Sequence, residues 1–338
     1  MGFKWVHGGT DAQGIPTHDF STNRNACGPC PQAVVAVQSA SSEQYPDPSY
    51  AALRAQLAAF HGVDVARIVI AGSASEWIHR MTMHAVRCGA VGMTLPKYHY
   101  GDYLHAAMNW QLTQWTRSEH VAHAGLHWAC EPSSPLGCAE DVWSHWSAET
   151  PINAWRVLDC AYRPLLLDGE PGADDLNHVW QMWTPNKALG MTGVRAAYVI
   201  APLHASASEL QTLQSLAPSW VVGAHGVAML HAWVQAPVQN WLAQSLVQLR
   251  EWKRSQIALC QQLGWEVLAG HMANYFVVRW PADWHGERMH AALTALRAQG
   301  IKLRDCSSFG LEGHVRLGVL PPASQHALQC AWQAILKK

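Results

Sequence analysis

Short apolar runs alternate with helical stretches between residues 68 and 201, and this alternation limits the possible folds more than any other feature. The run RIVIA leads through a small-residue turn into a helical stretch, and VGMTL is followed by a second one. LHWAC, AWRVLD and RAAYVI are further short apolar runs that end in loops. Strands and helices in alternation form a mostly parallel sheet covered by helices. Ligands bind such sheets beyond the carboxyl ends of the strands, so we expect the functional residues there.

The beginning of the chain predicts an extended arm followed by two helices. Residues 1–30 are rich in Gly, Asn, Thr and Pro. A helix is predicted to begin at Pro31, because proline suits the first turn of a helix. A second, amphipathic helix is predicted with Ser49 as its N-cap and Gly62 at its end.

The pattern changes near residue 225. A long helical stretch follows, and Pro237 is predicted to break or kink it. Short strands, a helix near residues 286–299 and a terminal helix then indicate a second, smaller α/β unit. We therefore predict an N-terminal arm (1–30) that packs with the small domain and the active site, a large cofactor-binding domain (31–225) and a small C-terminal domain (226–338).

Charge and hydropathy exclude two classes of partner. The formal net charge is −1, so the chain lacks the basic surface that nucleic-acid binding requires. The apolar runs are short and are interrupted by His, Arg or Gly, so we expect no membrane span. The start of the sequence lacks the apolar core of a signal peptide, and nine scattered cysteines fit a reducing compartment. We therefore expect a cytoplasmic protein.

Four features that carry chemistry follow the predicted strands. Lys187 lies in a loop before the strand 194–200, and Asp159 and Tyr162 stand at the end of the run VLDCAY. The turn AGSASE opens a helix, whose free amides and dipole can bind an anion. Pyridoxal phosphate needs a lysine for its Schiff base, an acid for its pyridinium nitrogen and a cradle for its phosphate. The four features together therefore suit that cofactor.

On these motifs the chain resembles, nearly from end to end, the fold-type I pyridoxal-phosphate enzymes of the aminotransferase class I/II family. TPNKALGMTGVR is similar to the family's S-x-S-K…G-x-R signature, and DCAY to its D-x-A-Y. The resemblance implies an α/β fold with a large domain, in which a mostly parallel seven-stranded sheet lies between helices, and a smaller C-terminal α/β domain. It also implies pyridoxal 5′-phosphate as the cofactor.

The matched positions imply the catalytic and cofactor-binding residues. Lys187 would carry the cofactor covalently, Asp159 would pair with its pyridinium N–H, and Tyr162 would bond the 3′ oxygen of its ring. The residues implied to hold the cofactor phosphate are Ala74, Ser75, Thr184 and Arg195.

The motifs offer several tyrosines as the aromatic partner of the cofactor ring, and two polar positions differ from those of the family. PKYHYGDY resembles the family's P-T-Y segment, which implies that Tyr98 stacks on the ring, with Tyr100 and Tyr103 as alternatives. Ser134, in EPSSPLG, stands where the family has an Asn that bonds the ring oxygen. Asn186 lacks the hydroxyl that is common just before the lysine.

The resemblance also implies the substrate residues and a self-association. QYPDPSYAALR resembles a family segment whose tyrosine, here Tyr45, reaches the phosphate site of the neighbouring subunit, which implies a homodimer. Arg304 and Arg316 match two arginines that serve anionic groups of the substrate. His7 and Asn23 would line the substrate pocket. The implied substrate is therefore a small anionic amino acid.

Three functions remain open. The segments VHGG and HDFSTNRNACGP resemble the opening of threonine-phosphate decarboxylase, which implies decarboxylation of L-threonine O-3-phosphate to aminopropanol phosphate in cobalamin biosynthesis. The alternative enzyme is an aminotransferase of the histidinol-phosphate type that acts on a phosphorylated or other anionic amino acid. A degenerate homologue that binds the cofactor without turnover is the non-enzyme alternative, motivated by Ser134.

Two further patterns invite other chemistry. Cys27-Gly28-Pro29-Cys30 is the tetrapeptide of thioredoxin-type centres, but it lies in the arm before any strand, where the family has a turn. We expect the cysteines to be small substitutes in that turn and keep a redox role as a hypothesis. The chain has 20 histidines, but the pair His123 and His127 has neither an intervening Glu nor an evident third ligand, so we expect no metal site.

Overall fold

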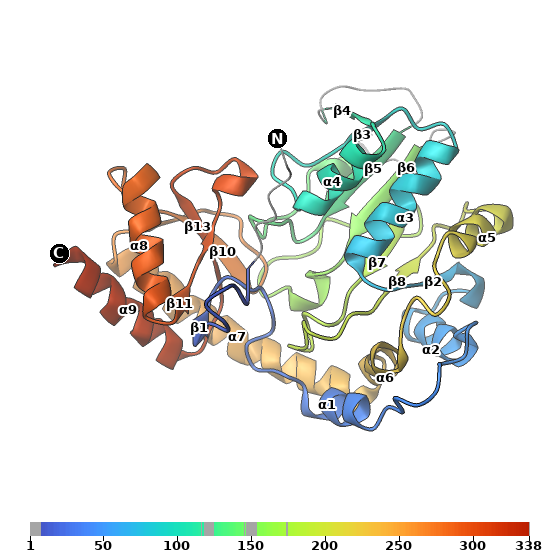
Figure 1. Ribbon diagram of the computed structural model, residues 1–338, viewed down its shortest axis with the longest axis horizontal. Helices are drawn as coiled ribbons and strands as arrows, with labels where there is room; N and C mark the ends of the chain where they lie inside the picture. The colour runs from blue at the N-terminus through green and yellow to red at the C-terminus, as the bar shows by residue number, and fades with distance from the viewer. Residues whose placement is uncertain are drawn as a thin grey trace.

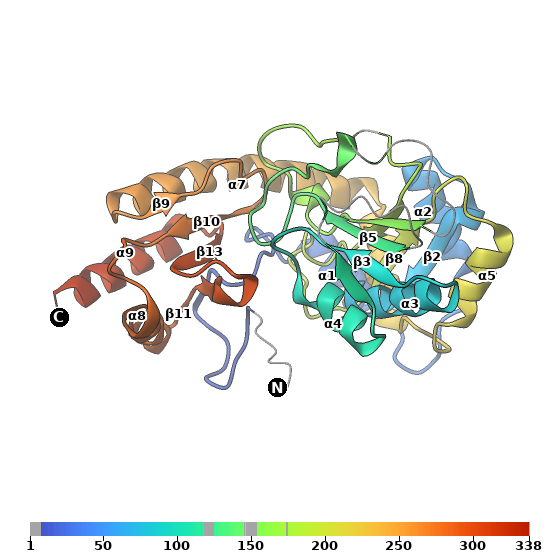
Figure 2. The same ribbon diagram turned by 90° about the horizontal axis from the view of Figure 1, so that it is seen from above.

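The chain folds into a larger α/β part around one sheet and a smaller α/β part, and one long helix runs along both (Figures 1 and 2). The computed structural model describes residues 8–115, 117, 125–144, 146, 154–173 and 175–337. The long helix is α7, Ala236–Gln262. Among the described residues, no helix combines the length and the apolar character that a membrane span needs.

The sheet of the larger part has seven strands in the described residues, in the order β2-β8-β7-β6-β5-β3-β4. In chain order they are β2 (Ile68–Ala71), β3 (Gly92–Thr94), β4 (Thr113–Trp115), β5 (Gly125–Cys130), β6 (Ala154–Asp159), β7 (Trp180–Trp183) and β8 (Ala197–Ile200). β8 runs antiparallel to β2 and β7, and the other neighbours pair in parallel. The predicted mostly parallel, seven-stranded sheet is confirmed.

Helices cover both faces of this sheet (Figure 1). One face packs against α3 (Ala74–Arg87), α4 (Gly101–Asn109) and α5 (Ala207–Ser215). The other face packs against α1 (Pro31–Gln38), α2 (Ala51–His61), α6 (Ala224–Trp233) and part of α7. Because both faces are covered, strands such as β2 are buried at every residue, which explains their continuous apolar runs.

The ends of two helices test the predicted caps. Gly62 ends α2 with φ 64°, in the left-handed region that glycine tolerates, as predicted. The Ser49 cap is wrong: the N-cap position is Tyr50, and the side chain of Asp47 accepts hydrogen bonds from the amides of Ser49 and Ala51. The carboxylate of Asp47, three residues before the cap, thus accepts the hydrogen bonds that were expected of the serine hydroxyl. The predicted break at Pro237 is confirmed, since α6 has ended and the proline lies in the first turn of α7.

The smaller part contains an antiparallel sheet in the order β12-β13-β10-β9, covered by two helices. Its strands are β9 (Glu266–Val267), β10 (Tyr275–Arg279), β12 (Arg304–Asp305) and β13 (His314–Gly318), and its helices are α8 (Gly286–Ala298) and α9 (Pro322–Leu336). Four buried indoles, of Trp265, Trp280, Trp284 and Trp332, pack against one another in its core. Single 3₁₀ turns are η1 (Val65–Arg67), η2 (Val142–Ser144), η3 (Arg163–Leu165) and η4 (Ser307–Phe309).

The N-terminal arm is attached to the smaller part. Its short strand β1 (His18–Asp19) pairs in parallel with β11 (Ile301–Lys302), which follows α8. The two segments come from opposite ends of the sequence and lie side by side (Figure 1). The arm then crosses toward α1 in the larger part. The division into residues 1–30, 31–225 and 226–338 stays a prediction.

Candidate active site

A cavity of about 250 Å³ lies beyond the carboxyl ends of the parallel strands. Loops after β2, β5, β6 and β7 contribute to its wall, together with the amino end of the reversed strand β8 and the N-terminal arm. Its lining residues are Gly8, Ser73, Ala74, Ser75, Tyr100, Cys130, Ser134, Asp159, Ala161, Tyr162, Thr184, Asn186, Lys187, Thr192, Arg195 and Ala196. Eight of the predicted site residues are thus brought together: Ala74, Ser75, Ser134, Asp159, Tyr162, Thr184, Lys187 and Arg195.

Lys187 presents its amine to this cavity from the loop after β7. Its Nζ donates to Thr184 Oγ1 at 3.3 Å and lies 5.4 Å from the ring centroid of Tyr162. The arm fixes the loop, because the amide of Asn25 donates to the Lys187 carbonyl at 2.9 Å and its side chain to the Ala188 carbonyl at 3.0 Å. Burial lowers the pKa of Lys187, and the nearby charge of Asp159 opposes that shift. The lysine is therefore more nucleophilic than a solvated one.

Asp159 ends β6 as a buried carboxyl group with two hydrogen-bond donors. Its Oδ1 accepts from the amide of Ala161 at 2.9 Å, and its Oδ2 accepts from Tyr103 Oη at 2.7 Å. Burial raises the pKa of Asp159, while the charge of Lys187 and the hydrogen bond from Tyr103 lower it. The sequence motifs did not predict that Tyr103 would donate to the acid, because they offered it only as an alternative stacking residue.

The first turn of α3 forms the polar end of the cavity. Ser73 caps the helix by accepting from the amide of Glu76 at 3.1 Å, and the Glu76 carboxylate accepts from the amide of Gly72 at 2.9 Å. The amides of Ala74 and Ser75 are in the first turn and have no acceptor within the helix. Together with Arg195, which lines the same cavity, this end suits a phosphate.

Of the three candidate stacking tyrosines, Tyr100, one of the two alternatives to Tyr98, is the one on the wall of the cavity. Tyr98 is not among the lining residues. It packs in a separate apolar cluster with Leu136 and Phe309, and Lys97 Nζ lies 5.1 Å above its ring. The geometry therefore favours Tyr100 over Tyr98 as the ring-stacking residue.

Tyr162 meets the arm at the cavity wall. Asn23 Nδ2 donates to Tyr162 Oη at 3.4 Å, and Asn23 Oδ1 has no hydrogen-bond partner among the described residues although it is buried. Burial raises the pKa of Tyr162 to about 12, and the charge of Arg316 partly opposes this. Tyr162 therefore keeps its proton at neutral pH, and the free oxygen of Asn23 can accept a bond from a bound molecule.

Two arginines of the smaller part lie next to this wall. Arg316 Nη1 donates to Ser134 Oγ at 3.4 Å, and its Nη2 donates to the carbonyl of Ser21 at 3.1 Å. Arg304 faces Arg316 across the β12–β13 pair and donates to Ser308 Oγ at 2.7 Å. Burial, with the charge of Arg316, lowers the pKa of Arg304 to about 10. No carboxylate within the described residues forms an ion pair with Arg316, so its buried charge suits an anionic ligand.

Other predicted residues fall outside the cavity. Tyr45 is 76% exposed and stacks on Trp220 with ring centroids 4.3 Å apart, so within one chain it does not reach the site. His7 and His123 lie outside the described residues. Among the residues that are described, no three His, Cys, Asp or Glu side chains gather as metal ligands.

The CGPC segment forms a tight turn against the lysine loop. A Cβ on Gly28 would lie 2.8 Å from the Leu189 carbonyl, so the turn requires a glycine there. The amide of Cys30 donates to the same carbonyl at 2.9 Å. Burial raises the pKa of the Cys27 thiol to about 11, whereas a redox thiol needs a lowered pKa. The turn geometry and the protonated thiol argue against the redox hypothesis.

The cavity fits pyridoxal phosphate on its own geometry. It combines a buried lysine amine, a buried acid and an anion-binding helix end in a volume of about 250 Å³. These are the groups that the cofactor requires. Ser134 supplies a shorter polar group than the family Asn, and it is already in contact with Arg316.

Comparisons with known proteins agree with this fit. A family model described as aminotransferase class I and II matches residues 83–335. A histidinol-phosphate aminotransferase from Jannaschia sp. is 25% identical over 338 residues, which cover 94% of this chain and 91% of that protein.

Two solved structures share the fold. The histidinol-phosphate aminotransferase from Sinorhizobium meliloti, in complex with pyridoxal-5′-phosphate, aligns with a TM-score of 0.77 at 20% identity over 94% of this chain and 89% of its own. L-Threonine-O-3-phosphate decarboxylase from Porphyromonas gingivalis aligns with a TM-score of 0.72 at 19% identity over 91% and 94%. Since the family model spans most of the sequence, the chain belongs to the aminotransferase class I and II family and is a pyridoxal-phosphate enzyme of fold type I, as its motifs led us to expect.

Proposed function

We propose that this enzyme decarboxylates L-threonine O-3-phosphate to aminopropanol phosphate, the step that cobalamin biosynthesis requires. The observation that carries the proposal is the position of the arm. Gly8 of the segment VHGG lines the cavity, Ser21 of HDFSTNRN accepts a hydrogen bond from Arg316, and Asn23 bonds Tyr162. This arm is the part of the sequence that resembles the decarboxylase.

The cofactor would be held at both ends of the cavity. Ala74, Ser75, Thr184 and Arg195 would bind its phosphate, and Asp159, Tyr162 and Tyr100 would contact its ring. Lys187 would carry it covalently. When bound, pyridoxal phosphate withdraws electrons from the α-carbon of an amino compound and so weakens the bonds at that carbon.

The residues of the chain would then decide which bond breaks. Arg316 and Arg304 would bind the carboxylate and the phosphate of the substrate, and their placement sets the orientation of the α-carbon. Asp159 would hold negative charge at its carboxylate, a role that the hydrogen bond from Tyr103 supports. Lys187 would deliver a proton from Nζ to the carbon that has lost carbon dioxide.

An aminotransferase of the histidinol-phosphate type is the second candidate, favoured by the relative from Jannaschia sp.. In that reaction Lys187 Nζ would instead remove the proton of the α-carbon. The degenerate, non-enzyme homologue is set aside, because the chain belongs to an enzyme family and both Lys187 and Asp159 line the cavity.

The proposal includes a cytoplasmic homodimer in which Tyr45 reaches the neighbouring subunit. The exposed stack of Tyr45 on Trp220 supports this, because a large aromatic pair on the surface suits an interface. Sedimentation of the wild-type protein and of Tyr45→Ala, each at several concentrations, would measure the association.

Product analysis separates the candidates. Purified holoenzyme is given L-threonine O-3-phosphate alone, or histidinol phosphate with 2-oxoglutarate. Carbon dioxide with aminopropanol phosphate supports the decarboxylase, whereas glutamate with a keto product contradicts it in favour of the aminotransferase. Lys187→Ala should lower the rate about a thousandfold, while Lys97→Ala, a change at an exposed lysine, should not. Absence of both products from wild-type enzyme would contradict both enzyme candidates for these substrates.

A further inference from the structure

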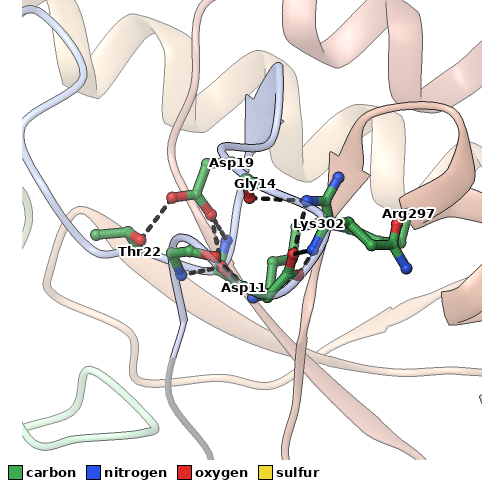
Figure 3. Close-up of polar contacts among 9 residues, drawn as sticks. Asp11, Gly14, Asp19, Thr22, Arg297 and Lys302 are labelled. Carbon is green, nitrogen blue, oxygen red and sulfur yellow. Dashed lines mark hydrogen bonds and ion pairs between the residues drawn. The ribbon is translucent and has the colours of Figure 1, made fainter.

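The arm carries a second polar cluster, outside the cavity, that centres on Asp11 (Figure 3). Residues 11–14 form a tight turn, in which the amides and carbonyls of Asp11 and Gly14 bond one another. Gly14 has φ 89°, and Asp11 Oδ1 accepts from the amide of Gln13 at 3.0 Å. The Asp11 carboxylate is therefore held in one orientation by its own turn.

Two cations of the smaller part converge on this carboxylate. Arg297, in the last turn of α8, donates from Nε to Oδ2 at 2.9 Å and from Nη2 to Oδ1 at 2.8 Å. Lys302, in β11, brings Nζ to within 2.9 Å of Oδ2. Arg297 Nη2 also donates to the Gly14 carbonyl at 2.9 Å. We call Asp11, Arg297 and Lys302 the arm latch.

The latch is better shielded from water than the other ion pairs of the same region. The side chains of Arg297, Lys302 and Asp11 are 12%, 16% and 30% exposed. By contrast, Arg288, on the same helix α8, is 51% exposed and pairs with Asp283, which is 63% exposed. A bidentate guanidinium–carboxylate pair that is joined by a second cation is also more directional than a single ion pair on the surface. Both differences suit a contact that fixes a position.

From the latch, hydrogen bonds lead directly to the cavity. Lys302 Nζ donates to the Gly9 carbonyl at 2.6 Å, and the Gly9 amide donates to Ser21 Oγ at 2.8 Å. Asp19 holds Ser21 in turn, by accepting from its hydroxyl at 2.5 Å and its amide at 3.0 Å. Ser21 presents its carbonyl to Arg316.

Gly8 is the end of this path. It lines the cavity, and a Cβ there would lie 2.2 Å from the Ser21 carbonyl oxygen. The arm backbone and Ser21 therefore pack without a gap, so a shift of the loop at Gly9 moves both the cavity wall and the acceptor of Arg316.

We propose that Asp11 is a positioning residue: by pairing with Arg297 and Lys302 it holds Gly8 and Ser21 in place and thereby sets the geometry of anion binding at Arg316. Only the identity of that anion rests on the proposed function. Asp11 acts through the arm, so it affects the affinity for the anionic substrate more than the binding of the cofactor.

The test compares Asp11→Asn with Arg288→Gln in the holoenzyme. Asparagine keeps the size of the side chain and its bond to Gln13 but loses the charge, and Arg288→Gln removes an ion pair from α8 without touching the arm. Hydrogen exchange should become about three- to tenfold faster at the amides of Gly9 and Ser21 in Asp11→Asn only. The KM for L-threonine O-3-phosphate should rise by a similar factor, with kcat and the visible absorbance of the cofactor little changed.

A second variant guards against a purely structural effect. Arg297→Lys keeps a positive charge but loses the two-pronged contact, so it should lie between wild type and Asp11→Asn in both measurements. Unchanged exchange at Gly9 and Ser21 in Asp11→Asn would overturn the proposal, as would faster exchange with an unchanged KM. If the wild type does not turn over L-threonine O-3-phosphate, the proposed function fails, and the exchange rates still decide whether Asp11 holds the arm.

Discussion

At the scale of single residues, the site depends on burying opposite charges that only partly compensate one another. Burial pushes Lys187 toward its neutral amine and Asp159 toward its neutral acid, and each opposes the shift of the other. The charge of Lys187, the phenol of Tyr103 and the Ala161 amide all favour the ionised form of Asp159. The buried phenol of Tyr103 thus helps to keep a negative charge on the acid.

Tyr103→Phe should weaken the enzyme through the ionisation of Asp159. A hydrogen bond to a charged group contributes about 1.5–3 kcal/mol, so the pKa of Asp159 should rise when the phenol is lost. If activity needs the carboxylate, the acidic limb of the pH–rate profile should move to higher pH. The profile is measured on holoenzyme with saturating cofactor.

Tyr198→Phe is the matched control for that variant. Tyr198 is as deeply buried, but it bonds His61 and Trp233 in the core rather than a site residue. Loss of the Tyr198 hydroxyl should lower the free energy of unfolding and leave the acidic limb of the pH–rate profile at the wild-type pH. An acidic limb at the same pH in Tyr103→Phe and in wild type would contradict the role given to Tyr103.

The motifs located the lysine, the acid and the phosphate turn, but not the tyrosines. Tyr98, Tyr100 and Tyr103 lie within six residues, and which of them meets the cavity depends on where α4 begins. The helix begins at Gly101, so Tyr100 stays outside it at the cap and lines the cavity, whereas Tyr103 points from its first turn to the core. The start of the helix therefore decides which tyrosine lines the cavity, and propensity does not fix boundaries so finely.

At the scale of elements, the arm turn and the lysine loop are built as one unit. Gly28 and Gly190 approach so closely that a Cβ on either would lie about 3 Å or less from the backbone of the other. Asn25, which is fully buried, bonds the loop on one side and Ser245 of α7 on the other. The sequence identified the turn by its Gly-Pro, but not the loop against which it packs, because such contacts join segments far apart in the chain.

Gly28→Ala should therefore disturb the lysine loop. Its added methyl group would meet the Leu189 carbonyl at 2.8 Å, and overpacking of this kind costs about 1–3 kcal/mol. We expect a lower free energy of unfolding together with weaker cofactor retention on dialysis. Gly193→Ala, where a Cβ meets open space, should change neither. A Gly28→Ala protein as stable and as well loaded as wild type would contradict the close contact.

At the scale of the whole molecule, the strand alternation predicted the sheet and its mostly parallel order. It did not predict that β8 is reversed, although that reversal brings Arg195 to the same edge as Lys187. Nor did it predict the pairing of β1 with β11, because two-residue strands carry no periodicity. Both features arise from long-range packing, and both position parts of the site.

The stability of the whole fold should fall in mild acid because of His61. Burial lowers the pKa of His61 from 6.5 to about 4 in the folded protein, so the unfolded chain takes up a proton that the folded one does not. The free energy of unfolding should therefore be retained above pH ~6.5 and decrease by about 3 kcal/mol from this residue as the pH falls to ~4. Chemical denaturation of wild type, His61→Gln and His290→Gln at several pH values measures this decrease.

His290 is exposed on α8, so the stability of its variant should change with pH as that of the wild type does. His61→Gln should be less stable at pH 7 but less sensitive to acid, and parallel slopes for all three proteins would show that His61 is not a source of the acid sensitivity.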